Sequence, residues 1–179
     1  VPAGEVVEKA VQLKLGSTNA PLELPQWWRL FPQADPEQLD EKDWASLPDQ
    51  LPAKDGTPVR GQQVMATGGR LDFGEIFDGF AEKRPVIGFA YLDSRAAVTL
   101  PAAASADWWM AWYVNGKQVY STLDTGNRHG SLADHTFELP LNAGRNVIAF
   151  QCLSGSAGWS LQFAGPRGRA LAVPRGAPP

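Results

Sequence analysis

Three acidic side chains in the segment 71–80 form a first group whose type and spacing could do chemistry: Asp72, Glu75 and Asp78. Carboxylate and carbonyl oxygens are the ligands that a hard cation such as calcium prefers. The alternative is that these acids are solvated around the end of a strand. The segment supplies candidate ligands for a structural calcium ion, and we expect no other cofactor.

A second polar group lies in the stretch 124-DTGNRHGSLADH-135. The spacing of His129, Asp134 and His135 within it fits no standard zinc arrangement. The sequence contains no Gly-rich phosphate loop, no Gly-x-Ser-x-Gly elbow and no His-Glu-x-x-His helix. A glycosidase pair could be drawn from the acids of the chain, but local context singles out none of them. We therefore expect this chain not to be an enzyme.

Aromatic residues crowd the stretch 107-DWWMAWYVNGKQVY-120, which holds three of the seven tryptophans. In a strand, alternate side chains point to opposite faces, so Met110, Trp112 and Val114 share one face. We expect that face in the core, because Met and Val have no polar role outside. Trp109 and Tyr113 fall on the other face, where the N-terminal segment, a ligand or a partner must cover them.

Aromatic rings beside polar side chains are the residue types that bind carbohydrate. A pyranose ring packs its polarised C–H groups on an indole, while its hydroxyls need fixed donors and acceptors at the edge. The candidates at the start of the aromatic strand and in the loop after it are Trp108, Trp109, Tyr113, Asp124, Asn127, Arg128 and His129. The alternative for the loop is a polar surface connection. Four further tryptophans could serve as rim aromatics or as core anchors, and we favour the core: Trp27, Trp28, Trp44 and Trp159.

Composition excludes several classes of partner. The formal net charge of −3 gives no broad basic field for nucleic acid. No apolar run approaches the roughly 18 residues that a bilayer-spanning helix needs. Cys152 is the single cysteine, so no internal disulfide can form.

From residue 61 onward the chain reads as short runs of alternating apolar and polar residues, bounded by turn residues. The expected strands are 63–67, 69–73, 86–94, 96–100, 107–114, 117–123, 135–141, 145–153 and 158–164. Asn115-Gly116 predicts a two-residue type I′ hairpin, and 142-NAG-144 predicts a second hairpin. No long segment carries a helical period, so the pattern predicts an all-β sandwich.

The N-terminal part is harder to assign. Residues 5–15 alternate like a first strand, whereas 16–61 carries seven prolines and many acids. We predict that 16–61 is an irregular wrapping segment anchored by its aromatics. The domain is expected to cover 1–168, followed by a Gly-, Pro- and Arg-containing linker at 169–179.

The segments 107-DWWMAWYVNGKQV-119, 139-LPLNAGRN-146 and 158-GWSLQF-163 resemble the galactose-binding-like jelly-roll modules attached to bacterial glycoside hydrolases and polysaccharide lyases. The resemblance covers about residues 86–164. It departs from the family at Trp108 and Trp109, where a second acidic residue or glycine is common. The resemblance implies a jelly-roll β-sandwich, and its motif is structural rather than catalytic.

The resulting expectation is a non-catalytic carbohydrate-binding module that targets a secreted, periplasmic or surface enzyme to a polysaccharide or oligosaccharide. The alternative is a structural or protein-interaction sandwich that packs on a neighbouring catalytic domain. Exposed indoles flanked by polar side chains favour the first function, and a broad apolar patch favours the second.

Overall fold

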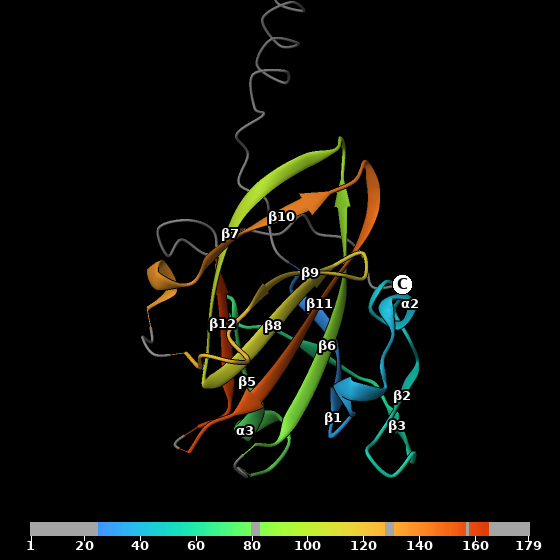
Figure 1. The fold of residues 1–179 in the computed structure, drawn as a ribbon, viewed down its shortest axis with the longest axis vertical. Helices are drawn as coiled ribbons and strands as arrows, with labels where there is room; N and C mark the ends of the chain where they lie inside the picture. The colour runs from blue at the N-terminus through green and yellow to red at the C-terminus, as the bar shows by residue number, and fades with distance from the viewer. Residues whose placement is uncertain (1–24, 80–82, 128–130, 157, 165–179) are drawn as a thin grey trace, which may run out of the picture.

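The computed structural model describes residues 25–79, 83–127, 131–156 and 158–164, which fold into two antiparallel β-sheets packed face to face (Figure 1). The larger sheet has the strand order β4-β1-β6-β11-β8-β9. Its strands are β1 (Trp27–Pro32), β4 (Gln62–Met65), β6 (Pro85–Ser94), β8 (Trp108–Val114), β9 (Lys117–Ser121) and β11 (Gly144–Ser154). The all-β sandwich predicted from the alternating runs is confirmed.

The smaller sheet has the order β10-β7-β12-β5. Its strands are β5 (Arg70–Asp72), β7 (Val98–Ala106), β10 (Thr136–Leu141) and β12 (Ser160–Ala164). A separate hairpin pairs β2 (Gln50–Pro52) with β3 (Pro58–Arg60). The remaining elements are single turns of helix: η1 (Pro36–Gln38), α2 (Glu41–Trp44), α3 (Phe73–Ile76) and η2 (Leu132–Asp134). No helix in the described ranges is long and apolar enough to cross a membrane.

The core between the two sheets is built around aromatic rings. Trp28 packs against Trp112, Phe150 and Phe163, with ring centroids 6.1, 5.0 and 5.4 Å apart. The face predicted for the core of β8 is buried as expected, with Met110, Trp112 and Val114 at most 3% exposed. Seven apolar residues of the strands expected at 135–141, 145–153 and 158–164 are also buried, and Phe137 is half-buried against them: Leu139, Leu141, Ile148, Phe150, Cys152, Leu161 and Phe163.

The prediction of an irregular segment over 16–61 is wrong for Trp27–Pro32, which forms a strand inside the larger sheet between β4 and β6. Trp28 and Leu30 enter the core between the sheets, while Phe31 packs on the outer face of the same sheet. A strand buried on both faces has a nearly continuous apolar run instead of an alternation, which hid it among the prolines. Residues 1–24, including the strand expected at 5–15, and the linker expected at 169–179 lie outside the described residues.

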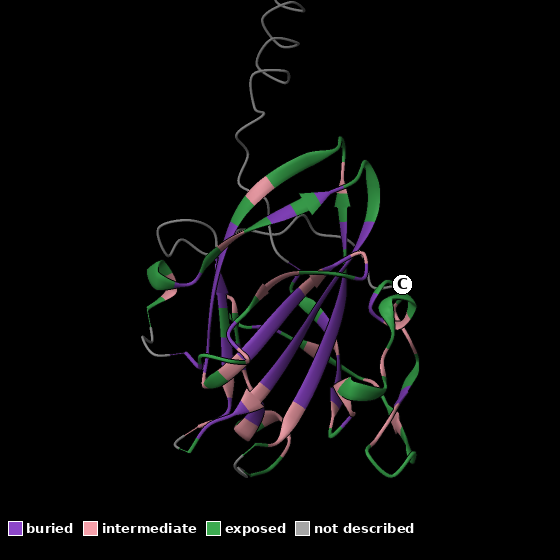
Figure 2. Cartoon of the chain, in the orientation of Figure 1, coloured by how far each residue is buried: buried purple, intermediate pink, exposed green. Residues whose placement is uncertain are grey.

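Residues 33–61, here named the covering segment, lie beside β1 and β6 (Figure 1). Trp44 and Leu51 from this segment pack with Ile87, Phe89 and Ala149 in a second apolar cluster on the outer face of the larger sheet. Figure 2 accordingly shows β6, β8 and β11 buried along most of their length. The larger sheet is therefore covered on both faces over its centre.

The hairpin predicted at Asn115-Gly116 is confirmed, since it joins the paired strands β8 and β9. The hairpin predicted at 142–144 is wrong, because β10 pairs with β7 in the smaller sheet while β11 pairs with β6 and β8 in the larger one. The turn at 142–144 instead carries the chain from one sheet to the other. Asn115 and Gly116 both have positive φ, 49° and 86°, as the type I′ turn requires. Gly144 takes φ 91° at the start of β11. Both turns use glycine where an L side chain would be strained.

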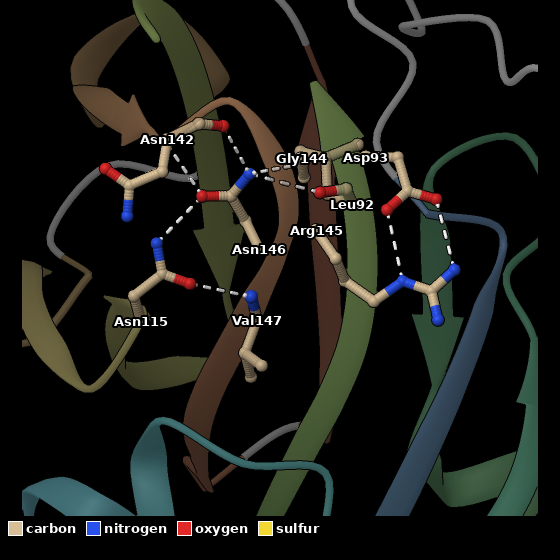
Figure 3. A network of polar contacts seen from close by, with 8 residues as sticks. All are labelled: Leu92, Asp93, Asn115, Asn142, Gly144, Arg145, Asn146 and Val147. Atoms are coloured by element: carbon tan, nitrogen blue, oxygen red, sulfur yellow. Dashed lines mark hydrogen bonds and ion pairs between the residues drawn. The ribbon is translucent and has the colours of Figure 1, made fainter. Parts of the chain in front are cut away.

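The Asn115-Gly116 hairpin and the turn at 142–144 are joined by the side chain of Asn146 (Figure 3), which is fully buried. Its Oδ1 accepts hydrogen bonds from the Asn115 side chain and the Asn142 backbone N–H, both at 2.8 Å. Its Nδ2 donates to the carbonyls of Asn142, Gly144 and Leu92 at 2.9, 3.1 and 3.3 Å. The sequence features 115-NG-116 and 142-NAGRN-146 are thus parts of one polar network.

We expect Cys152 to react with thiol reagents only after unfolding. Its side chain is fully buried in β11, and this burial raises the pKa of the thiol. The thiolate is the reactive form, so both access and ionisation are suppressed. Labelling with a chromogenic disulfide at neutral pH should be negligible in the folded protein and complete in denaturant. Rapid labelling of the folded chain would contradict this expectation.

Candidate functional site

The predicted sugar-binding residues are dispersed by the fold. Tyr113 stacks on Trp44 with ring centroids 4.0 Å apart and an interplanar angle of 11°. The covering segment therefore occupies a face of this ring, and burial raises the pKa of the Tyr113 hydroxyl. This arrangement removes Tyr113 from the candidate contact residues and makes it part of the second cluster.

Trp108 stands at the edge of the larger sheet and keeps 38% of its surface exposed. Its side chain lies so close to Gly126 and Gly155 that a Cβ atom on either glycine would collide with it. The Trp108 carbonyl also accepts a hydrogen bond from the Asn127 N–H at 2.9 Å. The indole is thus held in place from two sides while part of it remains open to solvent.

The loop after β9 divides between exposed and buried residues. Asp124 is exposed, whereas Asn127 is 3% exposed and donates from Nδ2 to Ser105 Oγ at 3.0 Å and to the Ala106 carbonyl at 2.6 Å. The prediction that Asn127 contacts a ligand is therefore corrected, because its amide ties the loop to β7. Arg128 and His129, the other two candidates here, lie outside the described residues.

The acidic candidates for a cation site have structural partners. Asp72 caps α3 by accepting the Glu75 N–H at 3.3 Å, and its second oxygen accepts from Arg70 at 3.0 Å. Asp78 follows the helix in a left-handed conformation, with φ 47°. Among the residues that the structure describes, no three His, Cys, Asp or Glu side chains come together as metal ligands. The proposed grouping of Asp72, Glu75 and Asp78 is thus not formed.

The remaining tryptophans also divide into buried and exposed residues. Trp28, Trp44 and Trp159 are at most 5% exposed, so the core role favoured for them is confirmed. The core role favoured for Trp27 is wrong, because this residue is 44% exposed. It pairs across the strands with Met65, which is 53% exposed. These two residues form an apolar patch at the β1–β4 edge.

A groove that sequence reasoning missed lies on the outer face of the larger sheet, beyond the covered centre. Strand register gathers one end of four strands there, because Pro32 pairs with Val86, Pro85 with Leu153, and Leu153 with Trp109. In Figure 1 these strand ends lie in the lower part of the view, where β11 ends and β6 begins. We name this feature, with a volume of about 1080 Å³, the sheet groove.

The floor of the sheet groove includes Pro85, Gln151 and Leu153. Polar residues at the start and in the hairpin of the covering segment line one side: Gln33, Asp35, Glu37, Lys54 and Asp55. Leu123, after β9, and Lys83, before β6, complete the lining. The groove therefore offers amide, carboxylate and ammonium groups over a partly apolar floor.

The only signal of this groove in the sequence is Gln151, a polar residue inside the apolar run 147-VIAFQCL-153. Gln151 is 7% exposed. A polar residue at this position is unusual for a buried strand. No local sequence pattern, however, predicts that the residues around 33–37, 53–55 and 83 lie next to Gln151. Only strand order and register bring them together.

No family model matches the chain, and no curated protein matches it in sequence. Solved structures do resemble its fold. A selenomethionine-labelled β-glucosidase from Kluyveromyces marxianus aligns with a TM-score of 0.50 and 11% identity, covering 81% of this chain and 18% of that one.

Two further structures resemble the chain at lower scores. The Faecalibacterium prausnitzii β-glucuronidase has a TM-score of 0.46 and 15% identity, covering 73% of this chain and 20% of its own. An anti-sigma factor domain-containing protein from Clostridium clariflavum has a TM-score of 0.45 and 12% identity, covering 79% and 42%. The chain spans less than half the length of each of these proteins. At 11% identity the likeness to the β-glucosidase shows the fold alone, an all-β sandwich.

Proposed function

We propose that this chain is a non-catalytic domain that binds carbohydrate and, as part of a larger secreted or surface protein, holds an enzyme on its polysaccharide. The observation that carries the proposal is the indole of Trp108, which is partly exposed and braced against Gly126 and Gly155. A fixed aromatic face loses little conformational freedom when a sugar ring packs on it. A sandwich of this kind within a β-glucosidase is consistent with such an accessory role.

The exposed loop residue Asp124 adds a carboxylate to the same side of the domain as Trp108, because Gly126 of that loop touches the indole. Carboxylates accept hydrogen bonds from sugar hydroxyls. Arg128 and His129 remain proposed contact residues from the sequence. The proposal for the edge site therefore includes Trp108, Asp124, Arg128 and His129.

Replacing Trp108 with alanine should weaken retention on a bound polysaccharide about ten-fold or more, which corresponds to ~1.4 kcal/mol. The measurement is affinity electrophoresis against a polysaccharide panel, supported by a glycan array. Trp27→Ala is the matched control, because Trp27 is similarly exposed but lies at the β1–β4 edge. Equal retention of the Trp108→Ala and Trp27→Ala variants would remove Trp108 from the site.

A second candidate function is docking on a neighbouring domain of the same protein. The observation that favours it is the apolar pair Trp27 and Met65 at the β1–β4 edge. Binding of no glycan, together with tight association with the flanking domain that Met65→Asp abolishes, would replace the first proposal with this one.

A further inference from the structure

We infer that a carbohydrate chain binds in the sheet groove, with Gln151 as the residue that orients it. The inference rests on the proposed carbohydrate-binding function and adds a second contact region to the edge site at Trp108. It concerns a neutral oligosaccharide segment rather than a single sugar ring. A volume of about 1080 Å³ exceeds the ~300–1,000 Å³ typical of pockets for drug-sized ligands.

Gln151 is the main reason to place a ligand here. It lies between Ile87 on β6 and Ala111 on β8, in the middle of a sheet whose outer face is otherwise apolar at this level. Its side chain is 7% exposed and lines the groove, and no residue in the described ranges forms a hydrogen bond with its amide. Its amide atoms are not among the buried polar atoms that lack a partner, so they face the open space of the groove, where a ligand can reach them. A primary amide offers two donors and an acceptor, the set that neighbouring sugar hydroxyls require.

The walls of the groove carry further groups that are free to bind. Asp35 already accepts from the Glu37 N–H and from the Gln38 side chain, and Asp55 accepts from the Thr57 N–H. Within the described ranges no hydrogen bond or ion pair engages the charged groups of Glu37, Lys54 or Lys83. Three carboxylates and two ammonium groups leave the lining close to neutral. This balance favours a neutral polyhydroxylated ligand over a strongly charged one.

The apolar part of the groove suits the faces of sugar rings. Leu153 and Pro85 contribute to the floor, and Trp109 is the direct cross-strand partner of Leu153 on β8. Directly opposed residues of antiparallel strands share a face, with Cβ atoms about 4.5–5.5 Å apart. Trp109 is half-buried on the same face of the sheet, directly beside Leu153. Trp108 precedes Trp109 in β8, and neighbouring strand residues point to opposite faces, so the edge site and the groove are separate contact regions.

The deciding variant is Gln151→Met, which removes the amide but keeps an unbranched side chain of similar size. Its melting temperature should stay the same or rise by a few degrees, because the Gln151 amide has no hydrogen bond to a described residue that the substitution would remove. Its affinity for the glycan that the wild-type protein retains should fall about ten-fold or more. Gln162→Met is the matched control, since Gln162 is exposed on β12 of the other sheet. A purely structural glutamine would lower the melting temperature and leave affinity unchanged.

The probes are linear glucan, xylan, mannan and galactan oligosaccharides from disaccharide to hexasaccharide, measured by calorimetry with the whole chain. Affinity should rise with chain length in the wild type, and this rise should be lost in Gln151→Met. Glu37→Ala and Lys54→Ala provide a second test, because both side chains are exposed and their loss leaves the fold intact. Each should weaken binding by a factor of about 3 or more, the effect of losing a single hydrogen bond.

The outcomes separate the two proposals. Glycan binding that depends on Trp108 but is unchanged in Gln151→Met, Glu37→Ala and Lys54→Ala would overturn the groove and leave the proposed function standing. Retention of no glycan by the wild-type protein would overturn the proposed function and the groove with it.

Discussion

Replacing Asn146 with alanine should lower the free energy of unfolding by about 3–4 kcal/mol, since several buried polar groups lose their partner at once. The Asn146 side chain joins five groups: the Asn115 side chain, the Asn142 N–H, and the carbonyls of Leu92, Asn142 and Gly144. Asn115 in turn accepts a hydrogen bond from the Val147 N–H at 2.9 Å, so the loss of Asn146 also affects the hairpin between β8 and β9. Asn146→Asp should also destabilise, because a carboxylate cannot donate to the three carbonyls.

The measurement is urea unfolding followed by tryptophan fluorescence, with the free energy extrapolated to water. Asn142→Ala is the matched control, because Asn142 is exposed and joins the network only through its backbone. It should change stability by no more than about 0.5 kcal/mol. If Asn146→Ala were as mild as Asn142→Ala, the network would be incidental to the fold.

Replacing Trp44 with alanine should cost about 3–5 kcal/mol, the usual range for truncating a buried tryptophan. Trp44 is 5% exposed, stacks on Tyr113 and lies 5.7 Å from Phe89 by ring centroids. It is the largest side chain with which the covering segment contacts the sheet. The variant should therefore loosen residues 33–61 while the core around Trp28 and Trp112 persists.

Two measurements check this expectation. Hydrogen exchange should rise first in the covering segment, and Trp27→Ala should change stability only slightly because Trp27 is exposed. The pKa of Tyr113, which burial raises above the ordinary 10.0, should fall back towards that value. A raised phenol pKa contributes stability that is lost as pH rises through it, so the variant should lose less stability above pH 10.0 than the wild type. Unchanged exchange in 33–61 would show that Trp44 does not hold the segment.

Much of the fold could be predicted because the relevant signals are local. The strands after residue 61 alternate, the turns carry Asn-Gly and Asn-Ala-Gly, and these patterns act over a few residues. Trp27–Pro32 was missed for the opposite reason. Trp28 and Leu30 are buried by the second sheet and Phe31 by the covering segment, and neither neighbour can be predicted from the strand itself.

The candidate site was less accessible to sequence reasoning. Residue type and proximity in sequence grouped Tyr113 and Asn127 with Trp108. In the structure Tyr113 stacks on Trp44, and Asn127 forms hydrogen bonds with β7. An aromatic or amide side chain has the same local signature in a core and at a binding surface. Burial decides between the two roles, and burial depends on segments far away in the chain.

By itself the sequence determined the class of fold, the Asn115-Gly116 hairpin and the inward face of β8, because hydrophobic period and turn chemistry are properties of neighbouring residues. Only the tertiary structure decided which aromatics stay open and where a ligand could lie. The register of β1, β6, β11 and β8 aligns Gln33, Pro85, Leu153 and Trp109 at one end of the sheet, and the covering segment closes the rest of that face. These residues lie far apart in the sequence, so no local pattern encodes their proximity.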